Sequence, residues 1–332
     1  MLKRTILLAA LFGGLVATIP GAGPGMNVAH AQFGACGSEW EQTDFSRRSV
    51  DLDEIMSGGP CKDRIPSIDA PEFVPVAEAG ELSALEPVIG LSINGDARAY
   101  PLRILTWHEI VNDVVGGVPV AVTYCPLCNA AIVFERTVDG TVLEFGTTGK
   151  LRKSDLVMYD RQTESWWQQF LGEAIVGEMT GKKLRFLPAR LEAWERFTAR
   201  HPDGRVQVPT DPGIRPYGDN PYVGYDTASR PFLYNGEYPE GIPPMARVVA
   251  VGTEAWSLEL LQSERRVESG DLVIVWEPGQ NSALDSRRID EGRDIGNVIV
   301  QRQTDGGLED VAYDVTFAFV FHAFRPEGTI HH

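Results

Sequence analysis

Cysteine is scarce in this chain, which has four cysteines among its 332 residues. Two of them, Cys125 and Cys128, lie close together in the stretch TYCPLCNAAIVFE. No second Cys-x-x-Cys pair accompanies them, so a metal site built on this pair needs ligands from elsewhere in the chain. Covalent c-type haem is excluded, because Asn129 stands where the attachment motif requires histidine.

Basic residues are also few: 30 Lys and Arg stand against 46 Asp and Glu, for a formal net charge of -16. A chain this acidic is not expected to bind nucleic acid. GTTGK is no phosphate-binding loop, because Leu151 replaces the required Ser or Thr, and WHEIVND has Asn112 at the second histidine position of the HExxH motif. We therefore expect neither a nucleotide cofactor nor a zinc-protease helix.

Long apolar runs are missing except at the start of the chain. There Lys3 and Arg4 precede TILLAALFGGLVATI, and residues 29–31, AHA, fit the cleavage pattern of a secretory signal peptide. No later segment is long and apolar enough to cross a membrane. We predict that residues 1–31 are a cleaved signal peptide and that the mature protein is periplasmic or secreted.

Unpaired cysteines are unusual in an oxidising compartment. The four cysteines divide into an early pair, Cys36 and Cys61, and the Cys-x-x-Cys pair. We predict a disulfide between Cys36 and Cys61. Pairing of either one with Cys125 or Cys128 is the alternative, because connectivity does not follow from sequence.

Strand signals dominate the chain after residue 75. Asn94 and Gly95, between PVIGLSI and ARAYPL, predict a β-hairpin. VPVAVTY and AAIVFER predict buried strands on either side of the Cys-x-x-Cys turn, and VTFAFVF a strand near the C-terminus. Helical spacing occurs in ARLEAWERFTARH and from Pro101 to Asp113, where it places His108 on the inward face.

The predicted class is α+β, mainly antiparallel β with a few helices, in one large domain over residues 76–326. Residues 32–75 are predicted to be an irregular N-terminal segment, and residues 327–332 a C-terminal tail. Residues 203–244 lose periodicity and are rich in Pro, Gly and Tyr, so we expect a long ordered loop that covers a site. No repeat of fixed period is apparent.

The first hypothesis for the Cys-x-x-Cys pair is a soft-metal site. A CP-x-C turn followed by Asn129, a residue that tolerates a left-handed backbone, is typical of turns that hold metal-bound thiolates. His108 is the expected third ligand, and Met158 or His322 the fourth. Two thiolates with an imidazole and a thioether favour copper(I) first and zinc second.

Two other hypotheses remain for the same pair. A metal-free thiol-disulfide oxidoreductase would use both cysteines, although NAAIVFER predicts a strand where thioredoxin-type pairs begin a helix. A ligand-binding scaffold would keep them as a structural disulfide and hold a carbohydrate or peptide with its Trp-rich and Tyr-rich segments. The sequence names no partner or substrate and does not decide whether the protein is an enzyme.

Polar and aromatic residues gather in the stretch KSDLVMYDRQTESWWQQF. The candidates for a pocket near the cysteines are Asp155, Tyr159, Asp160, Arg161, Trp166 and Gln168. A structural role is the competing interpretation for most of them, because large aromatic side chains tend to be buried. Glu109 and Asp113, which follow His108, are open to acid-base work but are expected on a solvated face.

Four motifs occur in order along the chain: AYPLRILTWHEIVND, VTYCPLCNAAIVFER, FGTTGKLRKSDLVMYDRQTESWWQQF and FAFVFHAFRP. Their succession resembles the bacterial domain-of-unknown-function family numbered 3179, from GGPCKDRIPSID to Pro326. The resemblance implies an extracytoplasmic protein and no particular activity. The family pattern that it implies includes His108, Cys125, Cys128, Asp155 and Tyr159 to Arg161. Cys61 and His322 depart from that pattern.

Overall fold

The chain is mainly β. The computed structural model describes Cys36, residues 39–80 and residues 82–332, so the predicted signal peptide at residues 1–31 lies outside the described residues. Strands make up 41% and helices 14% of the structure. The predicted α+β class is therefore wrong. The α-helices of the described chain have only seven residues each, and they connect strands instead of forming a layer of their own.

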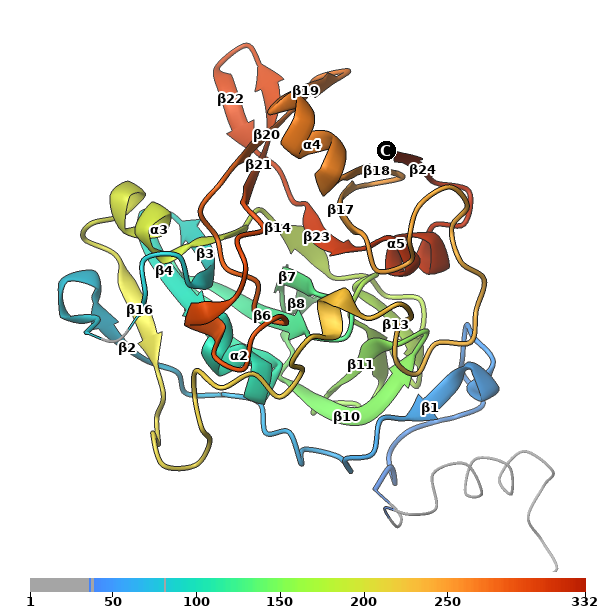
Figure 1. Cartoon of the computed structure of the whole chain (residues 1–332). Helices are drawn as coiled ribbons and strands as arrows, with labels where there is room; N and C mark the ends of the chain where they lie inside the picture. Colours follow the sequence, from blue (N-terminus) through green and yellow to red (C-terminus); the bar gives the residue numbers. More distant parts are fainter. Residues whose placement is uncertain (1–35, 37–38, 81) are drawn as a thin grey trace, which may run out of the picture.

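Five sheets of four or five strands are arranged like the blades of a five-bladed β-propeller (Figure 1). Their strand orders are β1-β10-β11-β12-β13, β14-β7-β6-β5, β15-β3-β4-β16-β2, β23-β17-β18-β24 and β19-β20-β21-β22. A small additional sheet pairs β8 with β9. The sheet of β19 to β22 and helix α4 lie at the top of Figure 1, and β10 lies at the bottom.

The strands of the first half of the chain are β1 (Ile55–Ser57), β2 (Glu72–Pro75), β3 (Pro87–Ile93), β4 (Asp96–Pro101), β5 (Ile110–Val115), β6 (Val118–Cys125), β7 (Ala130–Glu135), β8 (Thr137–Val138), β9 (Thr141–Val142), β10 (Phe145–Arg152), β11 (Asp155–Asp160) and β12 (Trp166–Gln168). Those of the second half are β13 (Glu173–Val176), β14 (Arg185–Leu187), β15 (Arg190–Ala193), β16 (Arg205–Val208), β17 (Arg247–Val251), β18 (Glu254–Ser257), β19 (Arg266–Ser269), β20 (Leu272–Glu277), β21 (Asn297–Thr304), β22 (Gly307–Asp310), β23 (Asp314–Phe317) and β24 (Thr329–His331). Strand β24 lies within the predicted C-terminal tail and pairs in parallel with β18.

Helical elements are short throughout the described chain. The α-helices are α2 (Leu102–His108), α3 (Trp194–Arg200), α4 (Leu258–Glu264) and α5 (Ala318–Phe324). The 3-10 turns are η1 (Leu52–Glu54), η2 (Val76–Glu78), η3 (Tyr225–Thr227) and η4 (Ile289–Glu291). No described helix is both long and apolar enough to span a lipid bilayer.

The predicted hairpin at Asn94 and Gly95 is confirmed, since these residues join β3 to β4. Their φ angles are 51° and 82°, as a two-residue turn with two left-handed positions requires. The predicted helix from Pro101 to Asp113 is too long. It ends at His108, because Glu109 has a φ of 60° and turns the backbone into β5.

One arrangement of strands and a helix occurs twice in the fold, although the sequence shows no repeat of fixed period. The first copy is β3-β4-α2-β5-β6, and the second is β17-β18-α4-β19-β20. Glu109 and Arg265 follow the two helices with φ angles of 60° and 61°. Their carbonyl oxygens accept hydrogen bonds from the backbone N–H groups of Tyr124 and Trp276, at 2.8 and 2.9 Å. Glu109 and Arg265 therefore hold equivalent positions.

The early cysteines form the disulfide expected from the sequence, between Cys36 and Cys61. The neighbouring Lys62 lies 2.6 Å from Glu164, and Trp40 packs against Tyr159 of β11. The disulfide thus holds the N-terminal segment against the sheet that contains β10 and β11.

Candidate metal centre

The turn between β6 and β7 carries both cysteines of the Cys-x-x-Cys pair. The backbone N–H of Cys128 donates to the carbonyl of Cys125 at 3.2 Å, and that of Asn129 to Pro126 at 3.2 Å. Asn129 has the expected left-handed backbone, with a φ of 52°, and its side-chain amide donates to Val315 at 2.7 Å. Both thiols are free and buried.

A second turn, between β10 and β11, meets this turn from the other side. Lys153 and Ser154 form it, with φ angles of 53° and 69°, and the next residue is Asp155. The carbonyl oxygen of Ser154 lies 3.5 Å from Sγ of Cys128 and 3.9 Å from Sγ of Cys125. The turn therefore delivers Asp155 to the cysteines, even though 26 residues separate Ser154 from Cys128.

Three donor atoms come together at the junction of these turns. Sγ of Cys125, Sγ of Cys128 and a carboxylate oxygen of Asp155 all lie within 4.8 Å of one another, and all three residues are buried. Oδ2 of Asp155 accepts hydrogen bonds from Nε2 of Gln168 at 2.6 Å and from the backbone N–H of Phe170 at 2.9 Å. Oδ1 accepts no hydrogen bond from a nitrogen or oxygen donor of the described chain, and the thiols of Cys125 and Cys128 are the donors that act on this carboxyl group. One oxygen is thus fixed, and the other faces the thiols.

The surroundings of these atoms are strongly acidic. Burial raises the pKa of Asp155 to about 6, that of Asp314 to about 7 and that of Glu109 to about 8. Burial also raises the pKa of the Cys125 and Cys128 thiols. None of the three carboxyl groups forms a salt bridge within the described residues. A bound cation would stabilise the ionised forms of these groups, because an opposite charge favours ionisation.

His108, the expected third ligand, is not brought to the thiols. Its Nδ1 lies 2.7 Å from the carbonyl oxygen of Pro66, and its Nε2 lies 2.8 Å from the hydroxyl of Tyr217. Both ring nitrogens are therefore occupied. Met158 belongs to the same buried hydrophobic cluster as the two cysteines, whereas His322 lines a surface groove and is not part of the donor cluster.

Among the pocket candidates, Asp155 and Gln168 belong to the centre and the others do not. Tyr159 and Trp166 are buried in a separate cluster with Trp40. Asp160 accepts a hydrogen bond from Nε1 of Trp167 at 2.8 Å. Arg161 forms ion pairs with Asp69 and Glu144, both at 2.6 Å.

Two acidic residues near the centre, Glu109 and Asp314, are not among the predicted site residues. The predicted solvated face for Glu109 and Asp113 is wrong, because each is only 8% exposed, and Asp113 is paired with Arg98 at 2.7 Å. The sequence signal for Glu109 is its position directly after a helix that faces the core. Asp314 begins β23 and accepts a hydrogen bond of 3.0 Å from the N–H of Ala131 in β7, at a sequence separation of 183, and no local pattern indicates it.

Strand β16 lies within the loop predicted over residues 203–244, and the segment between β16 and β17 packs over the centre. Tyr222, Tyr225 and Tyr234 pack against the cluster that contains the two cysteines. The hydroxyl of Tyr225 donates to the carbonyl of Leu127, between the cysteines, at 3.0 Å. Oγ of Ser154 donates to Phe232 of the same loop at 2.6 Å. The loop thus contacts both turns of the centre.

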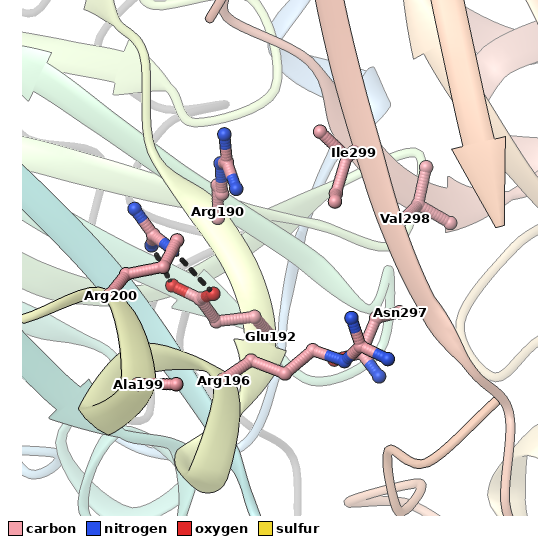
Figure 2. Close-up of a pocket in the computed structure, with 8 residues that line it drawn as sticks. All are labelled: Arg190, Glu192, Arg196, Ala199, Arg200, Asn297, Val298 and Ile299. Carbon is pink, nitrogen blue, oxygen red and sulfur yellow. Dashed lines mark hydrogen bonds and ion pairs between the residues drawn. The ribbon is translucent and has the colours of Figure 1, made fainter. Parts of the chain in front are cut away.

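Two open pockets have neither Cys125 nor Cys128 in their lining. Figure 2 shows one of about 170 Å³, where the guanidinium of Arg200 meets the carboxylate of Glu192. Its other arginines, Arg190 and Arg196, are paired with Asp310 and Glu277. These ion pairs connect α3 and β15 to β20 and β22. The pocket therefore lies between two sheets that are joined by ion pairs. The second pocket is a groove of about 450 Å³ whose lining includes Asp51, Glu54, Lys153, Glu237 and His322.

The family described as "Protein of unknown function (DUF3179)" matches residues 62–328. The chain belongs to this family. Searches of curated proteins and of solved structures found no match. The DUF3179 match includes every residue of the candidate metal centre, whereas Cys36 and Cys61 precede it. The centre therefore lies inside the matched region, and the disulfide lies outside it.

Proposed function

We propose that this protein is an extracytoplasmic zinc-binding protein, with Cys125, Cys128 and Asp155 as the ligands. The observation that carries the proposal is the convergence of three buried donor atoms from two separate turns within 4.8 Å of one another. Oδ1 of Asp155 accepts no hydrogen bond from a nitrogen or oxygen donor of the described chain, so its partners are the two thiols or a metal ion that replaces their protons.

The donor set favours zinc over copper(I). Imidazole and thioether ligands beside two thiolates would favour copper(I), but the third group at the thiols is a carboxylate in place of His108. Carboxylate oxygen is a hard ligand that zinc accepts together with thiolate, whereas copper(I) prefers soft donors. Thiolate ligation would also remove the thiol protons, which burial otherwise retains at neutral pH.

A metal-free thiol-disulfide oxidoreductase has less support. Such enzymes need a thiolate with a lowered pKa, commonly at the beginning of a helix. Here burial raises the pKa of both thiols, and the turn that carries them leads into strand β7. The disulfide between Cys36 and Cys61 supports the proposed extracytoplasmic location, because such bonds persist in oxidising compartments.

Metal content per chain tests the proposal. Wild-type protein, and the variants Cys125→Ser, Cys128→Ser and Asp155→Asn, would be loaded with zinc, desalted and measured by mass spectrometry of the elements. We expect about one zinc per wild-type chain and a large loss in all three variants, because each removes one ligand. His108→Gln is the matched control and should retain zinc. Retention of zinc in the two cysteine variants would refute the proposal.

A further inference from the structure

Glu109 is placed where the fold disfavours a carboxylate. It is 8% exposed, and its side chain has no hydrogen bond or ion pair among the described residues. It directly follows the last residue of α2, and a negative charge is unfavourable at the C-terminal end of a helix. Its backbone is left-handed, with a φ of 60°, which is uncommon for residues other than glycine. Such departures from local preference are typical of functional positions.

The second copy of the same unit shows that the fold does not require this carboxylate. Arg265 occupies the equivalent position with the same backbone conformation. It is exposed, and its guanidinium lies over the ring of Trp276, 4.5 Å from the ring centroid. A cation at the end of a helix is favourable. Both copies of the unit therefore have the left-handed backbone at this position. Only the copy that contains Cys125 has a buried carboxylate there.

Glu109 lies beside the metal centre without being one of the three clustered donors. Its carbonyl accepts a hydrogen bond of 2.8 Å from the N–H of Tyr124, the residue before Cys125. Ile110, the next residue, pairs with Thr123 of β6, so Glu109 and Cys125 lie at the same end of the paired strands β5 and β6. Three protein ligands leave one position of a tetrahedral zinc ion open, as in catalytic zinc sites.

We propose that Glu109 faces the fourth coordination position of the Cys125, Cys128 and Asp155 centre, and that this position binds an exchangeable small ligand, either water or a monovalent anion. This inference rests on the proposed function. A bound water would donate a hydrogen bond to the Glu109 carboxylate. An anion would be repelled by that carboxylate, so Glu109 would select water over anions at this position.

The test uses the full mature chain loaded with cobalt(II), which substitutes for zinc and gives visible absorption bands that depend on its ligands. Azide would be titrated into the wild type, Glu109→Gln and Arg265→Gln. We expect the bands of the wild type to shift at high azide concentration. Glu109→Gln should bind azide at least about tenfold more tightly, because it removes a nearby like charge. Arg265→Gln, the change at the equivalent position, should match the wild type.

Several results would overturn the inference. Bands that do not respond to azide in any of the three proteins would mean that the centre is closed. Equal azide affinity in Glu109→Gln and the wild type would mean that Glu109 does not face the open position. Loss of cobalt from folded Glu109→Gln would make Glu109 a ligand. If Glu109→Gln does not fold, Glu109→Ala supplies the same comparison. A wild type that binds no cobalt would instead refute the proposed metal binding. Failure of the proposed function can therefore be distinguished from failure of the inference about Glu109.

Discussion

Gln168 donates a hydrogen bond of 2.6 Å to Oδ2 of Asp155 and thereby fixes the carboxylate that meets the two thiols. Gln168 and Asp155 lie on paired strands, β12 and β11. Hydrogen bonds to a metal ligand from residues that do not themselves touch the metal orient that ligand and tune its affinity. The centre therefore includes Gln168 as well as the three donor atoms.

Replacement of Gln168 by Leu should weaken zinc binding without abolishing it. The variant loses the hydrogen bond that orients Asp155, and such losses reduce metal affinity by about 10-fold to 100-fold. Competition with a coloured chelator measures the affinity. Gln207→Leu is the matched control, because Gln207 is a buried glutamine whose side chain has no hydrogen bond in the described chain. Equal affinities of Gln168→Leu and the wild type would contradict this role.

The thiols of the metal-free, reduced protein should react slowly at neutral pH. Burial raises the pKa of Cys125 and Cys128, so little thiolate is present, and the thiolate is the reactive form. We expect alkylation by iodoacetamide to be at least about tenfold slower in the folded protein than in denaturant. Mass spectrometry follows the reaction. Rapid alkylation of the folded protein would instead favour a redox enzyme.

Removal of the Cys36–Cys61 disulfide should destabilise the protein and leave the metal centre intact. The bond closes a loop across a sequence separation of 25. On the chain-entropy estimate, a loop of this length contributes about 3 kcal/mol to the free energy of unfolding. Urea denaturation of the double variant Cys36→Ser, Cys61→Ser measures the loss. Zinc stoichiometry should stay at the wild-type value, and a loss of zinc would show that the two features are coupled.

His108 should make the protein less stable in mild acid. Burial lowers the pKa of His108 below its ordinary value of 6.5, so the unfolded chain takes up the proton more readily than the folded chain. Above pH 6.5, protonation of His108 therefore does not change the free energy of unfolding. As the pH falls from 6.5 toward the lower pKa of His108 in the folded chain, the free energy of unfolding decreases. We expect the free energy of unfolding of the metal-free wild type to fall more steeply over this range than that of His108→Gln. His332→Gln, at an exposed position, should follow the wild type.

Local features of the fold followed from the sequence because a few adjacent residues determine them. Asn94 with Gly95 fixes the first hairpin, and Asn129 fixes the left-handed end of the Cys-x-x-Cys turn. The ends of the helices depend on single backbone conformations, which apolar spacing does not report. Apolar and β-branched residues continue past His108, so the spacing did not reveal the left-handed backbone at Glu109 where α2 ends. In the same way, the predicted strand VTFAFVF divides into β23 and α5.

The ligand set depended on contacts between distant segments, which sequence spacing does not report. Asp155 reaches the cysteines through a turn made by Lys153 and Ser154, and neither residue is typical of a left-handed hairpin turn. His108 is closer to the cysteines along the chain than Asp155 is. The end of α2 instead directs it toward Tyr217, in a loop more than 100 residues later.

X-ray absorption spectroscopy at the zinc edge, on wild-type protein loaded with one zinc per chain, tests the central claim most directly. The account predicts two sulfur ligands at about 2.3 Å and the remaining ligands oxygen at about 2.0 to 2.2 Å. The Asp155→Asn variant should show the same two sulfur ligands and weaker zinc retention. A first shell without sulfur, or with imidazole in place of oxygen, would contradict the assignment of Cys125, Cys128 and Asp155 as the metal centre.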